Sequence, residues 1–211
     1  MGKVILSISS AIIEDIKGMA ETRPALIAYY YFDFMDASKR DVRGLLASLL
    51  CQLGDDSERC WEVLHQLYAT CHDGSEKPNE VALVNCLKTM LEFVEQVPIF
   101  VVMDALDECP IITGTPSARE EVLDLVEDLV ESGHSNLFIC VTSRPEPDIQ
   151  TVLNPLTPSS SRVSLHEEGG QKDDINNYIR SFVHTDRRMR RWRDEDREIV
   201  ISILSERADG M

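Results

Sequence analysis

Two runs of large apolar residues, each followed at once by polar ones, constrain the fold of this chain most. The runs are IFVVM at 99–103, which continues as DALDEC, and LFICVTS at 137–143, which continues as RPEPDI. Continuous apolar runs of this length predict strands that are buried on both faces, as in a parallel sheet. Predicted helices separate the strands along the chain. We therefore expect an α/β fold with a largely parallel sheet flanked by helices.

The remaining segments fit the same alternation. An aromatic strand is predicted at 26–34 and a short strand at 162–167. Ser117, with Glu120 three residues later, is the expected N-cap of a helix. Residues 144–161 are rich in proline and serine and are expected to be a surface segment. Apolar spacing predicts helices over 4–20, 42–53, 60–71, 80–97, 120–133, 173–183 and 194–210. In the first of these, the apolar positions at helical spacing are Ile5, Ile8, Ile12, Ile16 and Met19.

An acidic turn follows the first apolar run. Asp104 is expected at the carboxyl end of the strand, and Asp107 and Glu108 follow it closely. Ligands of open α/β sheets bind outside the carboxyl ends of the strands. A carboxylate at a rigid strand end can hold a hydrated Mg²⁺ on a nucleotide, and a second one can orient or deprotonate the attacking water. The pattern is that of a Walker B motif, although an acidic turn without a ligand fits the same residues.

A cation follows the second apolar run. Thr142 and Ser143 end the predicted strand, and Arg144 comes next. A hydroxyl donor and a fixed positive charge at this place are what recognition of a γ-phosphate requires. The alternative is that Arg144 pairs with a neighbouring acid on an acidic surface.

The start of the chain carries a fragment of a third pattern. A P-loop reads G-x-x-x-x-G-K-[ST] and opens a helix whose backbone N–H groups hold phosphates. Gly2-Lys3 matches the last Gly-Lys of that motif, but Val4 stands where serine or threonine is expected. Alone, this pair of residues indicates little.

Composition excludes some classes of partner. The net charge is −16, which argues against nucleic acid or an anionic membrane as a partner. No apolar stretch approaches the roughly 20 residues that span a bilayer. The arginine-rich segment 186–198 also carries acids and is expected to be a solvated helix face. Six scattered cysteines match neither a disulfide framework nor a zinc pattern and indicate reduced thiols in a cytoplasmic protein.

Together these segments resemble fungal NACHT-type P-loop NTPases, and more closely the nephrocystin 3-like N-terminal domain of fungal NOD-like receptor proteins. DALDEC and TSRPEPDI, in this order, are specific to that group. The resemblance covers nearly the whole chain and is carried by LSISSAIIEDI (6–16), LIAYYYFDFMDASKRDVRGLLASLLCQL (26–53), IFVVMDALDEC (99–109), LFICVTSRPEPDI (137–149) and DDINNYIRSFV (173–183).

The resemblance implies a nucleotide-controlled signalling switch that binds Mg²⁺ with ATP or GTP. Such modules are associated with effector domains and with repeats, which provide protein partners. Asp104 would hold magnesium through water, and Arg144 would sense the phosphate. Gly2 and Lys3 would bind phosphate, whereas Asp107 and Glu108 would be the catalytic carboxylates. Residues 1–183 would form the NACHT-like nucleotide-binding domain, and 184–211 would begin the following helical region.

The chain departs from the family at its start. The Gly-rich loop and the strand that precede Gly-Lys in the family are not in the sequence, so we expect a P-loop NTPase-like sheet that lacks its first strand, in an N-terminally truncated module. The missing contacts would cost about 5–10 kcal/mol, and a micromolar site has only about 8 kcal/mol in total. Weak or no nucleotide binding is therefore expected. The alternative is a non-catalytic interaction or scaffold fragment that docks partners through helices at 42–70 and 80–97.

Overall fold

The computed structural model describes residues 2–93, 97–111, 116–164 and 170–208. Its packing divides the chain into two compact units, Met1–Leu156 and Thr157–Met211. The family-based division at 183 and 184 stays a prediction, because a compact unit need not coincide with a family module. The two units are described separately below.

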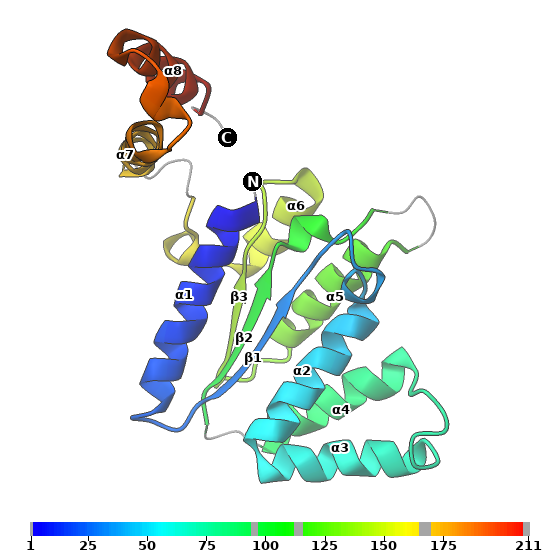
Figure 1. Cartoon of the computed structure of the whole chain (residues 1–211). Coiled ribbons are helices and arrows are strands. Elements are labelled where there is room, and N and C mark those ends of the chain that lie inside the picture. The colour runs from blue at the N-terminus through cyan, green and yellow to red at the C-terminus, as the bar shows by residue number, and fades with distance from the viewer. Residues whose placement is uncertain (1, 94–96, 112–115, 165–169, 209–211) are drawn as a thin grey trace. The chain divides into compact units, whose positions relative to one another are not determined.

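The first unit is built on a parallel sheet. Its strands are β1 (Leu26–Tyr31), β2 (Ile99–Asp104) and β3 (Leu137–Val141), in the order β1-β2-β3. Both pairs are parallel, and Leu26, Ile99 and Leu137 lie in register. Helices flank the sheet on both faces (Figure 1). The expected α/β class is confirmed, and the sheet is consistent with a P-loop-like fold that lacks its first strand.

Apart from α6, the helices of this unit begin and end close to the predicted positions. Ser117 caps α5 in a capping box with Glu120, as the sequence predicts. Asp41 and Ser57 are the N-caps of α2 and α3, where their side chains accept the N–H groups of Gly44 and Cys60. The helices are α1 (Gly2–Ala20), α2 (Val42–Asp56), α3 (Glu58–Thr70), α4 (Glu80–Phe93), α5 (Ala118–Glu131) and α6 (Pro147–Leu156).

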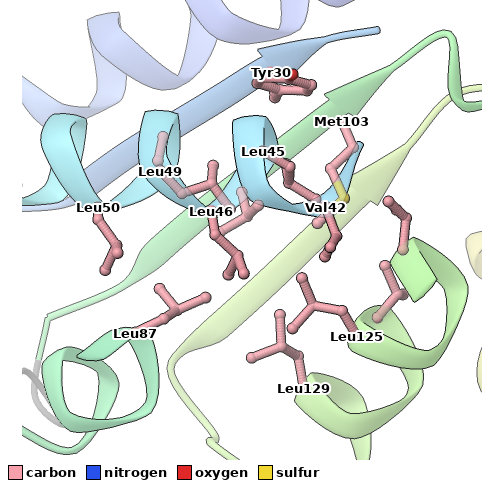
Figure 2. Packing of buried hydrophobic residues seen from close by; sticks show 14 of the residues in the cluster. Tyr30, Val42, Leu45, Leu46, Leu49, Leu50, Leu87, Met103, Leu125 and Leu129 are labelled. Atoms are coloured by element: carbon pink, nitrogen blue, oxygen red, sulfur yellow. The ribbon is translucent and has the colours of Figure 1, made fainter. Parts of the chain in front are cut away.

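The larger core lies between one face of the sheet and helices α2, α4 and α5. The leucines of α2 recur at helical spacing and point toward β2, α4 and α5 (Figure 2). Strand β2 is buried through its whole length except at Phe100, because it is the central strand. The labelled members of this core are Tyr30, Val42, Leu45, Leu46, Leu49, Leu50, Leu87, Met103, Leu125 and Leu129.

Helix α1 covers the opposite face of the sheet. Ile13 and Ile16 pack against Ile27 of β1 and Val102 of β2. Met19, which the apolar spacing placed on the same buried stripe, is 55% exposed instead. The buried stripe of α1 is therefore rotated from the predicted one and includes Ile13.

Strand β3 is less buried than predicted. A continuous apolar run indicated a strand covered on both faces, but every residue of β3 retains some exposure and Phe138 is 50% exposed. The reason is its position, since β3 pairs only with β2 among the described residues. Phe138 instead stacks on Phe100 of the neighbouring strand, with ring centroids 5.1 Å apart.

The other edge of the sheet is capped by a side chain. The amide of Gln52 in α2 accepts a hydrogen bond from the Tyr29 N–H at 3.1 Å and donates one to the Tyr29 carbonyl at 2.8 Å. These two bonds replace those that a further strand would make, and they shield the edge of β1 from association.

We predict that Gln52→Met lowers the free energy of unfolding by about 1–2 kcal/mol, because both backbone groups of Tyr29 lose their partner. Gln52→Glu, which keeps only the acceptor, should lose less. Urea unfolding followed by Trp61 fluorescence in a Trp192→Phe background reports on this unit alone, since the two tryptophans lie in different units. An unchanged midpoint in Gln52→Met would show that the amide does not stabilise the edge.

Helix α6 was not predicted. Its residues fall in the proline-rich segment that was expected only to be a surface segment, yet they form a helix from Pro147 to Leu156. Proline is tolerated in the first turn of a helix because that N–H has no intrahelical partner. Ile149 is 2% exposed and joins the main core, which anchors the helix.

The second unit contains α7 (Gly170–Thr185) and α8 (Asp194–Ala208), which pack against each other. The arginines near α8 pair with acids, as in Arg193–Asp196 and Arg197–Asp194. The strand predicted at 162–167 is not present at 162–164, and its remainder lies outside the described residues. No described helix, in either unit, is both long and apolar enough to span a bilayer.

Candidate functional site

The carboxyl ends of β2 and β3 meet at one rim of the sheet. The two strands are parallel neighbours, so the residues that follow them emerge on the same side (Figure 1). Asp104 is the last residue of β2, and Thr142 directly follows β3. The rim therefore brings together side chains that are far apart in sequence.

Asp104 is a buried carboxylate with one engaged oxygen. It is 1% exposed. Its Oδ1 accepts hydrogen bonds from the hydroxyls of Ser9, at 2.5 Å, and of Thr142. Its Oδ2 is buried and has no hydrogen-bond partner among the described residues. Burying an ionised oxygen without a partner is costly, so this atom is a candidate ligand for a cation.

A tight reversal of the chain follows Asp104. Ala105 adopts the left-handed conformation, with φ of 58°, which is uncommon for a residue other than glycine. Its N–H donates to Thr142 Oγ1 at 3.1 Å, and the N–H of Leu106 donates to the Thr142 carbonyl at 3.0 Å. Thr142 thus holds both Asp104 and the turn behind it. The sequence identified Thr142 as a polar group at the rim, but not this contact.

Asp107 and Arg144 form an ion pair across the rim. The Asp107 Oδ2 lies 3.2 Å from the Arg144 Nε, and the Asp107 Oδ1 accepts the Arg144 backbone N–H at 3.1 Å. The Asp107 side chain is 7% exposed, whereas that of Arg144 is 57% exposed. Glu108 is half-buried, and its side chain makes no hydrogen bond or ion pair with the described residues, whereas its backbone N–H donates to the Ala105 carbonyl at 2.8 Å. The two acids of the turn, a 3₁₀ segment over Leu106–Glu108, therefore have different surroundings.

Arg119 of α5 is a residue that sequence reasoning missed. It is 6% exposed, and its Nε and Nη2 donate to the carbonyls of Cys109 and Asp107 at 2.9 and 2.5 Å. Its Nη1 pairs with Asp148 of α6 at 3.1 Å. The sequence did contain an indication of its role. A cation in the first turn of a helix is unfavourable with respect to the helix dipole, so an arginine there indicates a specific partner. Arg119 ties the acidic turn to α6.

Ser9 was also missed. It is fully buried in α1, one turn before Ile13 on the face that packs on the sheet. A lone polar residue on that face was the available signal, but the predicted stripe did not include it. Its hydroxyl links α1 to the end of β2.

Two thiols lie beside the rim. Burial raises the pKa of the Cys109 thiol to about 11, with a smaller opposing effect from Arg119. Its Sγ contacts the Arg40 carbonyl at 3.2 Å as a weak donor. Burial, and then the charge of Asp104, also raises the pKa of Cys140. Both groups are protonated thiols at neutral pH, so neither is an activated nucleophile.

Gly2 and Lys3 are the first residues of α1. The side chains of residues 2–8 lie outside the part that the structure describes, so its geometry does not relate Lys3 to the rim. The roles of Gly2 and Lys3 stay predictions. Among the described residues, no three acids, histidines or cysteines gather into a metal-binding cluster.

Comparison with models of protein families identifies a match. The family model described as Nephrocystin 3, N-terminal matches residues 1–144. The matched range includes Asp104, Asp107, Glu108 and Arg144. No curated protein and no solved structure matches the chain.

Proposed function

Because the chain belongs to the family of nephrocystin 3 N-terminal domains, we propose that it is a nucleotide-binding switch module of a NOD-like receptor-type (STAND) NTPase. ATP or GTP, with Mg²⁺, would bind at the rim formed by the carboxyl ends of β2 and β3. One observation carries the proposal. A buried carboxylate with an unpartnered oxygen, Asp104, shares this rim with an exposed guanidinium, Arg144.

The residues at the rim fit magnesium. Mg²⁺ prefers oxygen ligands and is usually bound by one or two carboxylates, several waters and the phosphates of its substrate. Asp104 offers one carboxylate oxygen, and its other oxygen is fixed by two hydroxyls. When bound, the ion would neutralise charge on the phosphates. Asp104 would hold it through water, while Ser9 and Thr142 keep the carboxylate oriented.

Arg144 is the proposed contact to the terminal phosphate. A guanidinium binds phosphate oxygens bidentately, and this one is more than half exposed at the rim. Gly2 and Lys3 are the proposed phosphate ligands at the start of α1, where helix N–H groups favour anions. The acidic turn of Asp107 and Glu108 would supply the carboxylate that positions the attacking water.

As a switch, the module would act in the cytoplasm on protein partners bound by neighbouring domains of a longer protein. Nucleotide binding at the rim would contact both the turn after β2 and the loop before α6. Because Arg119 connects the turn to Asp148 in the first turn of α6, directly after that loop, the two segments would respond to nucleotide together. No role in binding nucleic acid or membranes is proposed.

The alternative proposal is a scaffold that docks partners. Fewer apolar side chains are available for docking in the structure than the sequence suggested. The apolar stripe of α2 is buried in the unit's own core, where it cannot contact a partner. Exposed apolar side chains remain on both α3 and α4, namely Trp61 and Tyr68, seven residues apart on one face of α3, and Val81 at the start of α4; the pair on α3 is a surface that favours docking. If Trp61→Ser and Tyr68→Ser together left every partner interaction intact, this alternative would fail.

We predict that the 211-residue chain binds Mg²⁺-nucleotide more weakly than low micromolar. The rim offers one carboxylate and one guanidinium, each contributing about 1.5–3 kcal/mol, against the roughly 8 kcal/mol that a micromolar site requires. Titration of a fluorescent nucleotide in the presence of Mg²⁺ measures this. Low-micromolar affinity that Lys3→Ala abolishes would contradict the prediction.

A further inference from the structure

Both oxygens of the Asp107 carboxylate are engaged by a single residue. Oδ2 contacts the Arg144 Nε at 3.2 Å, and Oδ1 accepts the Arg144 backbone N–H at 3.1 Å. With only 7% of its side chain exposed, Asp107 leaves little surface on which a water molecule could dock. A general base has to lie within hydrogen-bond reach of the water that it activates.

The backbone of Asp107 is held as firmly as its side chain. Its carbonyl accepts a hydrogen bond from the buried Arg119 at 2.5 Å. Arg119 therefore fixes the backbone of Asp107, and Arg144 fixes its carboxylate. These contacts hold Asp107 in one conformation in the absence of a ligand.

The contact on Arg144 leaves the far end of its guanidinium available. Asp107 engages Nε, and within the described part of the chain neither Nη nitrogen has a hydrogen bond. The exposed Nη groups are the donors that can bind a phosphate bidentately. The ion pair through Nε orients the guanidinium and leaves both Nη groups of Arg144 available as donors.

We infer that Asp107 is a positioning residue for Arg144, and that Glu108 alone supplies the carboxylate for water in the acidic turn. The Glu108 side chain is half-buried and makes no hydrogen bond or ion pair with the described residues, so a water can reach its carboxylate. The consequence for phosphate binding rests on the proposed function. The coupling of Asp107 to Arg144 does not, and it can be measured without a ligand.

The ligand-free test is a double-mutant cycle of Asp107→Ala and Arg144→Ala, followed by urea unfolding. We expect Asp107→Ala to raise the equilibrium constant for unfolding roughly tenfold in the wild-type chain, and by less than about threefold when Arg144 is already alanine. Asp107→Asn, which keeps the size of the side chain, serves as a second variant should the alanine variant not fold. Equal effects in both backgrounds would overturn the inference.

The ligand test uses Mg²⁺-tripolyphosphate, titrated to about 10 mM to reach weak affinities, with the amide shifts of Ser143, Arg144 and Glu146 as the signal. We expect Asp107→Ala and Arg144→Ala each to weaken binding about tenfold, the double variant to be no weaker than Arg144→Ala, and Asp124→Asn, at an exposed position of α5, to bind as the wild type does. Effects that multiply, or an Asp107→Ala chain that binds normally, would overturn the inference. Absence of binding by the wild-type chain would instead refute the proposed phosphate site, while the urea cycle would still decide the coupling.

Discussion

Arg119→Met is expected to lower the free energy of unfolding of the first unit by about 2–4 kcal/mol. Hydrogen bonds from a charged donor contribute about 1.5–3 kcal/mol each, and a buried acceptor that loses its donor pays its desolvation in full. Arg119 supplies such bonds to the carbonyls of Asp107 and Cys109. The methionine side chain recovers part of the apolar packing of the arginine stem, which is why the expected loss is not larger. Urea unfolding in the Trp192→Phe background measures it.

Two controls separate the buried contacts from the charge. Arg119→Lys keeps the positive charge but not the planar fork, so it should lose roughly half as much. Lys88→Met removes the exposed Lys88–Asp128 pair of the same unit and should change stability by no more than about 1 kcal/mol. If Arg119→Met cost no more than Lys88→Met, Arg119 would not be holding the acidic turn.

Asp104→Asn, in contrast, is expected to raise the free energy of unfolding of the first unit. Without a cation, Asp104 buries a charged oxygen that has no partner in the described structure. A neutral amide keeps the size and can still accept from the Ser9 and Thr142 hydroxyls, so the variant should be more stable by about 1–2 kcal/mol. For a unit of this size that corresponds to a rise of about 2–8 °C in Tm. The same change should abolish any Mg²⁺-dependent stabilisation by nucleotide.

Thermal unfolding with and without Mg²⁺-nucleotide tests both the expected rise in Tm and the expected loss of stabilisation by nucleotide. Asp124→Asn, at an exposed position of α5, is the matched control and should leave Tm nearly unchanged. A gain in stability with a loss of ligand response is typical of a residue kept for function. A substantial fall in Tm for Asp104→Asn would mean that the carboxylate is a structural acceptor rather than a ligand.

Much of the first unit could be predicted from the sequence because its signals are local. The continuous apolar run of β2 and the helical spacing of the leucines in α2 are both local patterns, and both elements form as predicted. The capping box of Ser117 is likewise a contact between residues three apart. The parallel arrangement followed from the alternation of these elements, and it placed Asp104 and Arg144 at strand ends.

The features that the sequence did not predict depend on contacts between segments that are far apart in the chain. The exposure of β3 follows from its edge position, which its own residues do not encode. Helix α6 forms despite two prolines in its range because Ile149 is buried in the core. The partners of Arg119 and Ser9 lie on other elements, so their roles became visible only in the folded structure.

The most direct measurement places the metal. Mn²⁺ with a triphosphate nucleotide, added to isotopically labelled protein, broadens the NMR signals of nearby amides. We predict that the strongest broadening falls on residues 105–108 and 142–145 and that it disappears in Asp104→Asn. Broadening that is centred elsewhere on this acidic chain, or that persists unchanged in Asp104→Asn, would contradict a nucleotide site at the rim of β2 and β3.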